Sequence, residues 1–355
     1  MRNRSESETE FSRLLIRWYE SNKRSLPWRA TRDPYKIWVS EVMLQQTTVQ
    51  TVIPYYEKWI VLFPDLQAFS RAPLQKVLKT WQGLGYYQRA KNMHKAAKII
   101  TSRFEGNFPT DYEELISLPG FGPYTTAAVL SITSDQPYPA IDANVRRVLL
   151  RLKSLKKEAD PNQDGELLRF LSPLLPQKKI GTFNQAMMEL GALVCRPKNP
   201  RCLLCPVSPF CQAYQDGEQE IIPTPKKNVT KKIEAVLAII EKNGRYLIQK
   251  RPSTGLMADL WEFPGGKKQT GESLEAALRR EIREELGVDV ERAERLTVVR
   301  HAYTQFKVTL YAYACRLTKF PLAEKKHRRW VSLKNLRRYP FPSGSAKIVE
   351  FLENR

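Results

Sequence analysis

The sequence contains no run of about 18 apolar residues, the length that a membrane-spanning helix requires. Its first residues, MRNRSESETEF, are polar where a secretory signal peptide has an apolar core. Internal repeats and low-complexity tracts are absent as well. These absences predict a cytoplasmic protein that is not inserted in a membrane, whose cysteines are reduced thiols unless a metal holds them.

Acidic residues are scarce relative to basic ones. The chain has 37 Asp and Glu against 58 Lys and Arg, so its net charge is +21 and its pI is about 9.8. Such an excess favours a polyanionic partner, either nucleic acid or an anionic membrane surface.

The chain has 355 residues, more than one hydrophobic core usually supports, so two domains are expected. Before residue 216, apolar residues recur with helical spacing, as in FSRLLIRWYE and TAAVLSI. The stretch IIPTPKKNVTKK has the composition of a linker, and strand-like runs follow it, with one helical pattern from Ser273 to Leu286. We therefore predict an all-α domain at 1–216, a linker at 217–233 and an α+β domain at 234–355.

Four of the five cysteines fall within seventeen residues: Cys195, Cys202, Cys205 and Cys211. The spacing C-x6-C-x2-C-x5-C offers four soft ligands to one inorganic centre. Zinc is one alternative, although structural zinc sites usually have two close pairs separated by about a dozen or more residues. Cys315 lies apart in the apolar run VTLYAYACRL and is predicted to be a buried strand residue.

The stretch DYEELISLPGFGPYTTAAVLSI predicts a helix, a glycine-rich turn and a second helix. Pro119 ends the first helix, and Gly120 and Gly122 allow positive φ and close approach of the backbone. Amides at the start of the second helix can then bind a DNA phosphate with help from the helix dipole. An ordinary helix-turn-helix corner is the alternative.

Two carboxylates stand out in the helical part. Asp142 directly precedes an apolar helical stripe. A role as the N-cap of that helix would by itself explain an aspartate at this position. Glu41 shares a helical face with Ile37, Trp38 and Leu44, so it is expected to be desolvated. Desolvation would raise its pKa and keep a proton available near neutral pH.

The stretch GGKKQTGESLEAALRREIREELGV fits the complete Nudix pattern, with Gly266, Glu272 and Arg280 at the required spacings. On one helix, three carboxylates stand at i, i+3 and i+4 and can converge on Mg²⁺: Glu281, Glu284 and Glu285. Arg280 can neutralise their mutual repulsion.

The segments LPWRATRDPYKIWVSEVMLQQTTV, LGYYQRAKN, LPGFGPYTTAAV, IDANVRRV and FNQAMMELGALVC, together with the cysteine loop, resemble the MutY-type adenine DNA glycosylases of the helix-hairpin-helix superfamily. The resemblance runs through essentially the whole chain. It implies a multi-domain fold in which an all-α helix-hairpin-helix glycosylase domain, made of a six-helix module and an iron-sulfur module, is joined to an α+β Nudix-like lesion-recognition domain. It also implies one 4Fe–4S cluster at the four cysteines.

The resemblance further implies a monofunctional DNA glycosylase in base excision repair, which hydrolyses the N-glycosidic bond of adenine opposite 8-oxoguanine or guanine in duplex DNA. Glu41 would protonate the adenine and Asp142 would stabilise the sugar cation, as paired acids do in glycosidases. Tyr124 and Asn144 would assist Asp142. Relatives that also cut the backbone have a lysine at position 124, so tyrosine implies base removal alone; packing behind the hairpin is the other interpretation.

Further roles follow from the resemblance alone. The adenine pocket would be lined by Trp28, Arg29 and Gln185. The duplex would be contacted by the wedge residues Gln46 and Tyr86, by Gly120 and Gly122, and by Arg196, Lys198 and Arg201. The lesion would be contacted by Tyr303, Thr304 and Gln305, where the family commonly has Phe-Ser-His. Core packing for Trp28 and Tyr86, and a solvated loop for the basic residues, are the alternatives.

Several alternatives remain open. The family usually lacks the Nudix acids, so the C-terminal domain either recognises the lesion or also hydrolyses oxidised nucleoside triphosphates with Mg²⁺. A catalytically idle damage-binding protein would not need Glu41 and Asp142. A thymine-mismatch relative would be expected to lack Glu41 and the C-terminal domain. We expect a monomer in the cytoplasm, associated with the nucleoid if the source is bacterial.

Overall fold

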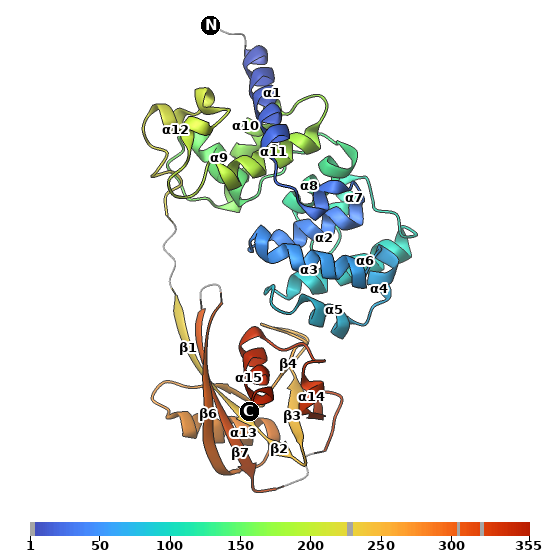
Figure 1. The fold of residues 1–355 in the computed structure, drawn as a ribbon, viewed down its shortest axis with the longest axis vertical. Coiled ribbons are helices and arrows are strands. Elements are labelled where there is room, and N and C mark those ends of the chain that lie inside the picture. Colours follow the sequence, from blue (N-terminus) through green and yellow to red (C-terminus); the bar gives the residue numbers. More distant parts are fainter. Residues whose placement is uncertain (1–3, 226–229, 304–305, 320–322) are drawn as a thin grey trace. The chain divides into compact units, whose positions relative to one another are not determined.

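The structure is a computed structural model that describes residues 4–225, 230–303, 306–319 and 323–355. Its contacts divide the chain into two compact units, which are described separately (Figure 1). The first comprises Met1–Arg71 and Lys95–Lys227, and the second comprises Ala72–His94 and Asn228–Arg355. The predicted boundaries at 1–216, 217–233 and 234–355 stay a prediction.

The part of the chain before residue 216 is helical, as its periodicity predicts. Its α-helices are α1 (Arg4–Asn22), α2 (Pro34–Leu44), α3 (Val49–Leu62), α4 (Leu66–Arg71), α5 (Leu74–Trp81), α6 (Gln88–Arg103), α7 (Tyr112–Ile116), α8 (Pro123–Ser134), α9 (Ala143–Leu152), α10 (Asp164–Leu171), α11 (Ile180–Leu193) and α12 (Gln212–Gln215). The short 3-10 helices are η1 (Pro27–Ala30), η2 (Pro161–Gln163), η3 (Ser172–Leu174), η4 (Cys202–Leu204) and η5 (Ser208–Phe210).

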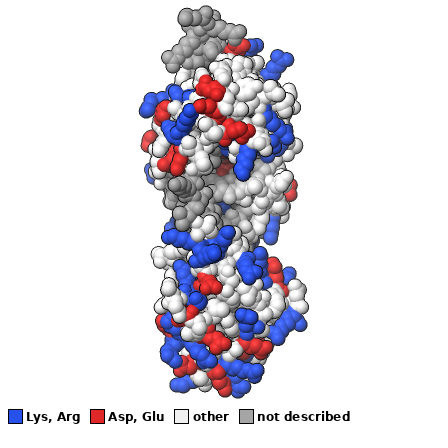
Figure 2. All heavy atoms as spheres, turned by 90° about the vertical axis from the view of Figure 1, so that its left-hand side faces the viewer, with Lys and Arg blue, Asp and Glu red and all other residues white. Residues whose placement is uncertain are grey.

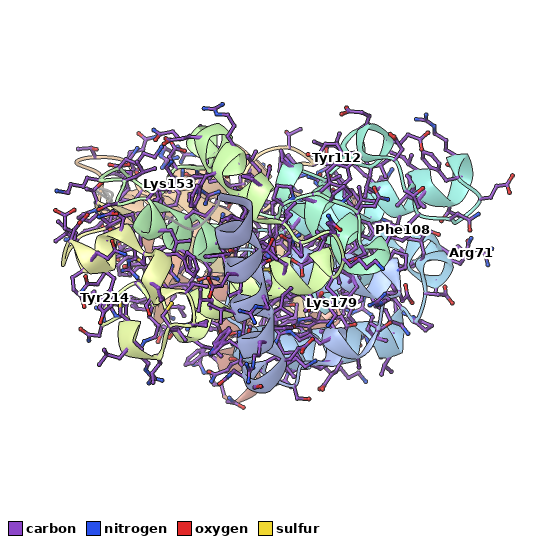
Figure 3. The ribbon with its side chains drawn as sticks, turned by 90° about the horizontal axis from the view of Figure 1, so that it is seen from above. Arg71, Phe108, Tyr112, Lys153, Lys179 and Tyr214 are labelled. Carbon is purple, nitrogen blue, oxygen red and sulfur yellow. The ribbon has the colours of Figure 1, made fainter. Side chains whose placement is uncertain are left out.

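Helix α11 is the centre of the first unit and contacts α1, α8 and α9. Two glycines permit this close packing. A Cβ at Gly181 would lie 2.3 Å from the carbonyl oxygen of Ser131 in α8, and one at Gly191 would lie 2.7 Å from the Cβ of Asn144 in α9. Seen from above, Lys153 and Tyr214 lie toward one end of the helical unit and Arg71 and Phe108 toward the other (Figure 3).

The predicted helix, turn and helix are present as α7 and α8. Gly120 has a φ of +87°, as a glycine-rich turn requires, whereas Gly122 has a φ of −103° and caps α8. The ring of Phe121 stacks on Trp38 of α2, with centroids 5.0 Å apart and planes at 15°. This contact joins the turn to the helix that carries Glu41, and α2 also packs against α8.

The elements that follow the linker form an α+β fold. They are β1 (Lys231–Ile239), β2 (Glu241–Lys242), β3 (Arg245–Lys250), β4 (Trp261–Glu262), β5 (Gly265–Lys267), α13 (Leu274–Leu286), β6 (Val290–Tyr303), β7 (Phe306–Leu317), β8 (Arg328–Ser332), α14 (Leu333–Leu336) and α15 (Ser343–Glu353). One sheet has the order β5-β1-β7-β6, in which β1 and β7 are parallel; a second has the order β2-β3-β4, with β8 paired to β3.

Residues of β1 alternate between two cores, because successive strand side chains point to opposite faces. Val236 and Ala238 pack with α13, whereas Leu237 and Ile239 pack with residues of α15. The helix predicted at Ser273 to Leu286 is confirmed as α13, with Ser273 as its N-cap. Cys315 is buried in β7, also as predicted.

No helix among the described residues is both long enough and apolar enough to cross a membrane.

Candidate active site

A cavity of about 1120 Å³ lies in the first unit, lined by residues of η1, α2, α8, α9 and α11. It brings together residues that are scattered through the sequence. The sequence-predicted site residues on its wall are Trp28, Arg29, Glu41, Gln46, Gly120, Gly122, Tyr124, Asp142, Asn144 and Gln185. Segments up to 157 positions apart, from Trp28 to Gln185, therefore form one site.

Glu41 is positioned by α2, whose start is defined by the Asp33 side chain and Pro34. Its side chain is buried, with 5% of the residue exposed. Burial raises its pKa to about 7, and the nearby Asp142 charge adds to this rise, while a hydrogen bond from the Tyr124 hydroxyl opposes it. A carboxyl group with this pKa is partly protonated at neutral pH, so it can donate a proton.

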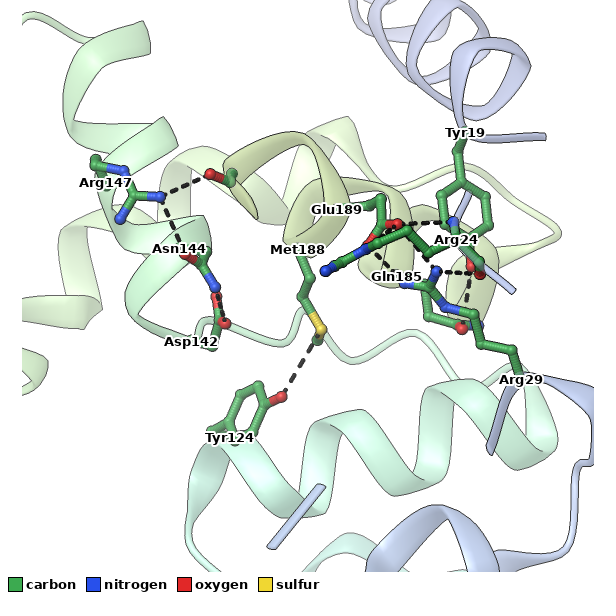
Figure 4. Close-up of polar contacts among 11 residues, drawn as sticks. Tyr19, Arg24, Arg29, Tyr124, Asp142, Asn144, Arg147, Gln185, Met188 and Glu189 are labelled. Atoms are coloured by element: carbon green, nitrogen blue, oxygen red, sulfur yellow. Dashed lines mark hydrogen bonds and ion pairs between the residues drawn. The ribbon is translucent and has the colours of Figure 1, made fainter. Parts of the chain in front are cut away.

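Tyr124 lies in the first turn of α8 and faces the cavity. Its hydroxyl donates to the Glu41 carboxylate. Figure 4 shows its second contact, with the Met188 sulfur at 3.7 Å. Burial and the adjacent carboxylates of Glu41 and Asp142 raise its pKa well above the ordinary value. Tyr124 is therefore a neutral hydroxyl donor.

Asp142 both caps α9 and lines the cavity, so capping does not exclude a role in the site. Its Oδ1 accepts a 2.7 Å hydrogen bond from the Val145 amide, and its Oδ2 accepts a 3.0 Å bond from the Asn144 side chain. Burial raises the pKa of Asp142, and these two hydrogen bonds partly oppose the rise. Each oxygen thus has one fixed donor and keeps further acceptor capacity for a cation.

Arg147 fixes the orientation of Asn144 (Figure 4). Its Nη2 donates to the Asn144 Oδ1 at 3.0 Å and to the Gly191 carbonyl at 2.8 Å, and its Nε donates to the Cys195 carbonyl at 2.9 Å. Because the Asn144 oxygen accepts from Arg147, its amide nitrogen is left to donate to Asp142. The cysteine loop and the aspartate are therefore joined through side chains of one helix.

The sequence interpretation missed Glu189, which lies on the cavity wall with only 1% of its side chain exposed. Its Oε2 is 2.6 Å from Arg24 Nη2 and 2.8 Å from Arg29 Nη2. Burial alone would raise the pKa of Glu189, but these arginines lower it to about 2. The available signal was its position one helical turn after Gln185, whose Oε1 accepts a 3.2 Å hydrogen bond from the Tyr19 hydroxyl.

Cys195, Cys202, Cys205 and Cys211 lie near one another after α11 and around η4 and η5. Burial raises the pKa of Cys205 to about 12, and the charges of the other three thiolates add to this rise. The Arg151 guanidinium approaches the Cys195 sulfur at 3.2 Å and supplies positive charge. A compact set of thiolates beside a buried arginine fits a 4Fe–4S cluster.

Among the described residues, no three Cys, His, Asp or Glu side chains are close enough together to hold a single metal ion.

The basic residues expected to contact DNA lie away from the cavity. Arg196, Lys198 and Arg201 lie in the cysteine loop and not on the cavity wall. Figure 2 shows Lys and Arg side chains across the face turned to the viewer, with acidic side chains among them. Gln46 and Tyr86 have φ values of 58° and 46°, a backbone conformation that residues other than glycine adopt uncommonly.

Of the residues expected to contact the lesion, Tyr303 ends β6. Thr304 and Gln305 lie outside the described residues.

The Nudix acids cluster around Arg280 in the second unit. The arginine pairs with Glu272 at 2.9 Å, with Glu281 at 2.9 Å and with Glu284 at 3.2 Å. Glu285 instead accepts from the Gly265 amide at 2.9 Å. Arg280 thus pairs with two of the three acids predicted to bind Mg²⁺, Glu281 and Glu284, while the Gly265 amide holds the third.

Two families match parts of the chain. The HhH-GPD superfamily of base excision DNA repair proteins matches residues 39–173, and the NUDIX domain matches residues 235–351. Both matches agree with the helical and α+β folds described above.

Full-length relatives are also similar. The adenine DNA glycosylase of Buchnera aphidicola subsp. Schizaphis graminum is 33% identical over 350 residues, which cover 97% of this chain and 99% of that protein. The adenine DNA glycosylase of Homo sapiens is 33% identical over 369 residues, covering 87% of this chain and 67% of that protein.

A solved structure of a thermostable thymine-DNA glycosylase aligns with a TM-score of 0.53 and 26% identity. The aligned region covers 60% of this chain and 100% of the thymine-DNA glycosylase. By contrast, the adenine DNA glycosylase of Buchnera aphidicola matches across both units. From the match over nearly the whole chain, the protein belongs to the adenine DNA glycosylase family of base excision repair.

Proposed function

We propose that the protein hydrolyses the N-glycosidic bond of adenine opposite 8-oxoguanine or guanine in duplex DNA. The observation that carries this proposal is the pair of carboxylates, Glu41 and Asp142, on the wall of one cavity. A proton donor and a stabilising anion are the two groups that an oxocarbenium-like transition state needs.

Glu41 donates its proton to N7 of the extruded adenine, which makes the base a better leaving group. Its pKa of about 7 makes the protonated form available at neutral pH. The Tyr124 hydroxyl holds the carboxyl group in place and stabilises the carboxylate after the proton has left. Asp142 then stabilises the sugar cation, with its orientation maintained by Asn144. Water adds to the anomeric carbon and gives its proton to the Glu41 carboxylate, which restores the acid.

The pocket residues suit a purine. Gln185 offers an amide, which can pair with the donor and acceptor edge of adenine, and Trp28 offers an aromatic surface. Arg29 is held by Glu189 at 2.8 Å, so its position is defined before the base enters. Of the described residues that line the cavity, none is a lysine, which supports base removal without Schiff-base cleavage of the backbone.

DNA binding is assigned to the hairpin and the cysteine loop. Gly120 and Gly122 let the backbone amides at the start of α8 approach a phosphate, and Arg196, Lys198 and Arg201 add positive charge. The four cysteines hold one 4Fe–4S cluster with a structural role, because four thiolates leave no position for substrate. Gln46 and Tyr86 wedge into the duplex while the adenine is extruded.

Base choice and lesion choice are tested together with full-length protein and duplexes that place A, T or C opposite 8-oxoguanine or guanine. Products are compared with and without alkali. We expect strand cleavage only in duplexes with A at the target position, and only after treatment with alkali. Near-wild-type single-turnover rates in both Glu41→Gln and Asp142→Asn would remove the proposed mechanism. A similar release of A and T would remove the proposed specificity.

Tyr303, Thr304 and Gln305 are proposed to contact 8-oxoguanine. Gln305 replaces a histidine, so readout there would use amide hydrogen bonds. Gln305→Ala should then narrow the difference in rate between 8-oxoguanine and guanine partners. An unchanged ratio would assign lesion choice to other residues.

A second candidate function is Mg²⁺-dependent hydrolysis of oxidised nucleoside triphosphates by the C-terminal domain. Burial raises the pKa of Glu262 to about 7, with added repulsion from Glu285 and Glu281. Acids that repel one another in this way are stabilised when a divalent cation binds. Full-length protein with Mg²⁺ and 8-oxo-dGTP should yield the monophosphate, and Glu281→Gln should not. No monophosphate from the wild-type protein would dismiss this activity.

A further inference from the structure

Residues Ala72–His94 belong to the same compact unit as the C-terminal part of the chain, although they lie within the helical part of the sequence. This segment contains α5, a turn at 82–87 and the start of α6. Tyr86 lies in the turn, between two helices that both contact residues beyond position 250. We call residues Ala72–His94 the Tyr86 segment.

A single residue, Asp259, contacts both helices of the Tyr86 segment. Its carbonyl oxygen accepts a 3.1 Å hydrogen bond from the Gln75 side chain in α5. Its carboxylate is 2.6 Å from the Lys91 ammonium in α6. Asp259 is 8% exposed and Lys91 is 7% exposed, so water screens this ion pair little.

Other contacts hold the same two helices. Trp261 Nε1 donates to the Gln75 side chain at 2.9 Å, and Lys91 donates to the Ser253 carbonyl at 3.1 Å. The Tyr87 hydroxyl, next to Tyr86, donates to the Phe341 carbonyl at 3.3 Å. The Tyr86 segment is therefore held on both sides of the turn.

The turn itself is internally braced. Trp81 Nε1 donates to the Gly85 carbonyl at 3.0 Å, and Arg89 donates to the Leu84 carbonyl at 2.9 Å. The Arg89 guanidinium lies over the Tyr86 ring, 5.6 Å from its centre. With a φ of 46°, Tyr86 has an unfavourable backbone conformation, which persists only where surrounding contacts maintain it.

We propose that Asp259 is a positioning residue for base extrusion: by holding α5 and α6, it keeps Tyr86 in the conformation that wedges into the duplex. This inference rests on the proposed wedge role of Tyr86. The C-terminal domain then has a second task besides contacting the lesion, because it sets the residue that separates the target base from its neighbours. Loss of the contact slows extrusion and leaves the chemistry at Glu41 and Asp142 unchanged.

The chain offers a matched control. Asp259 also pairs with Lys250 at 3.0 Å, and Lys250 lies in β3 outside the Tyr86 segment. Lys91→Met and Lys250→Met each remove one of these two lysines and leave Asp259 with the other. Neither variant strands a buried charge, so both should fold, which thermal melting checks.

The experiment measures single-turnover release of adenine by full-length protein from two substrates. In one, adenine is paired with 8-oxoguanine in a duplex; in the other, it lies in a short unpaired loop, where extrusion requires little work. Lys91→Met should be roughly tenfold slower on the duplex and unchanged on the loop. Lys250→Met should be close to wild type on both. In a Tyr86→Ala background, Lys91→Met should slow the reaction no further.

The proposal is overturned if the two lysine variants slow the duplex reaction equally, if Lys91→Met slows both substrates, or if its effect persists in full without Tyr86. An unchanged duplex rate in Lys91→Met overturns it as well. If the wild-type protein releases adenine from neither substrate, the proposed glycosylase function fails instead.

Discussion

The Tyr124 hydroxyl donates a hydrogen bond to the Glu41 carboxylate across 83 positions of sequence. This bond acts against burial, which raises the pKa of Glu41 to about 7. Tyr124 therefore adjusts the strength of the proposed general acid. The pair would set the pH range in which the proposed base removal works.

The first prediction concerns the pH dependence of excision. The rate of single-turnover adenine release should fall as pH rises above about 7, because Glu41 loses its proton there. Tyr124→Phe removes the donor that stabilises the carboxylate, so the pKa of Glu41 should rise and the falling limb should move to higher pH. If the falling part of the pH–rate profile lies at the same pH in Tyr124→Phe as in the wild-type protein, another group controls the rate.

The second prediction concerns stability at Glu41. Its folded pKa of about 7 exceeds the unfolded value of 4.5, so the native state holds this proton more tightly. The stability of the wild-type protein should therefore fall as pH rises between these values. Glu41→Gln removes the buried charge and should raise the free energy of unfolding at pH 8 by roughly 1 to 3 kcal/mol, with little gain near pH 4.

Denaturant unfolding of the two proteins at both pH values measures this difference. The variant should also lose about two to four orders of magnitude in excision rate. Equal stability at pH 8 would show that Glu41 is not desolvated as the structure indicates.

The sequence predicts the burial of Glu41 and the helix-capping position of Asp142 because the environments of both residues are local. Helical spacing places Glu41 among apolar side chains of its own helix, and Asp142 directly precedes an amphipathic helix. The structure then shows one as a buried acid and the other as an N-cap. Both properties depend on neighbours within a few positions, which a single sequence displays.

Long-range pairing cannot be read in this way. Glu189 meets Arg24 across 165 positions, and Gln75 meets Asp259 across 184, so nothing in the local pattern indicates either partner. The helix α15 was missed for a local reason: it begins with Ser-Gly-Ser, residues with weak helix propensity. Its apolar residues are buried in the core that it shares with β1.

The third prediction concerns Arg147, which holds Asn144 and the Cys195 carbonyl. Arg147→Met leaves the Asn144 oxygen without this donor, so the amide is free to turn away from Asp142. Excision should slow roughly ten- to hundredfold, because small displacements of a catalytic group cost that much. Rates are compared well below the melting temperature of the variant. An unchanged rate would show that Asn144 needs no support from Arg147.

The fourth prediction concerns Glu189, whose pKa of about 2 lies below its ordinary value of 4.5. Ion pairs with Arg24 and Arg29 then stabilise the native state above about pH 5, and this contribution is lost as pH falls toward 2. Glu189→Gln should lower the free energy of unfolding by roughly 3 kcal/mol at pH 7, and the difference should shrink steadily between pH 5 and 2.

The exposed pair of Glu20 with Lys179, at 3.0 Å, is the control, since Glu20→Gln should change stability little. A loss in Glu189→Gln that is equal at pH 7 and pH 3 would assign the effect to packing rather than to charge. Adenine release should also slow in Glu189→Gln, because Arg29 loses the partner that defines its position in the pocket.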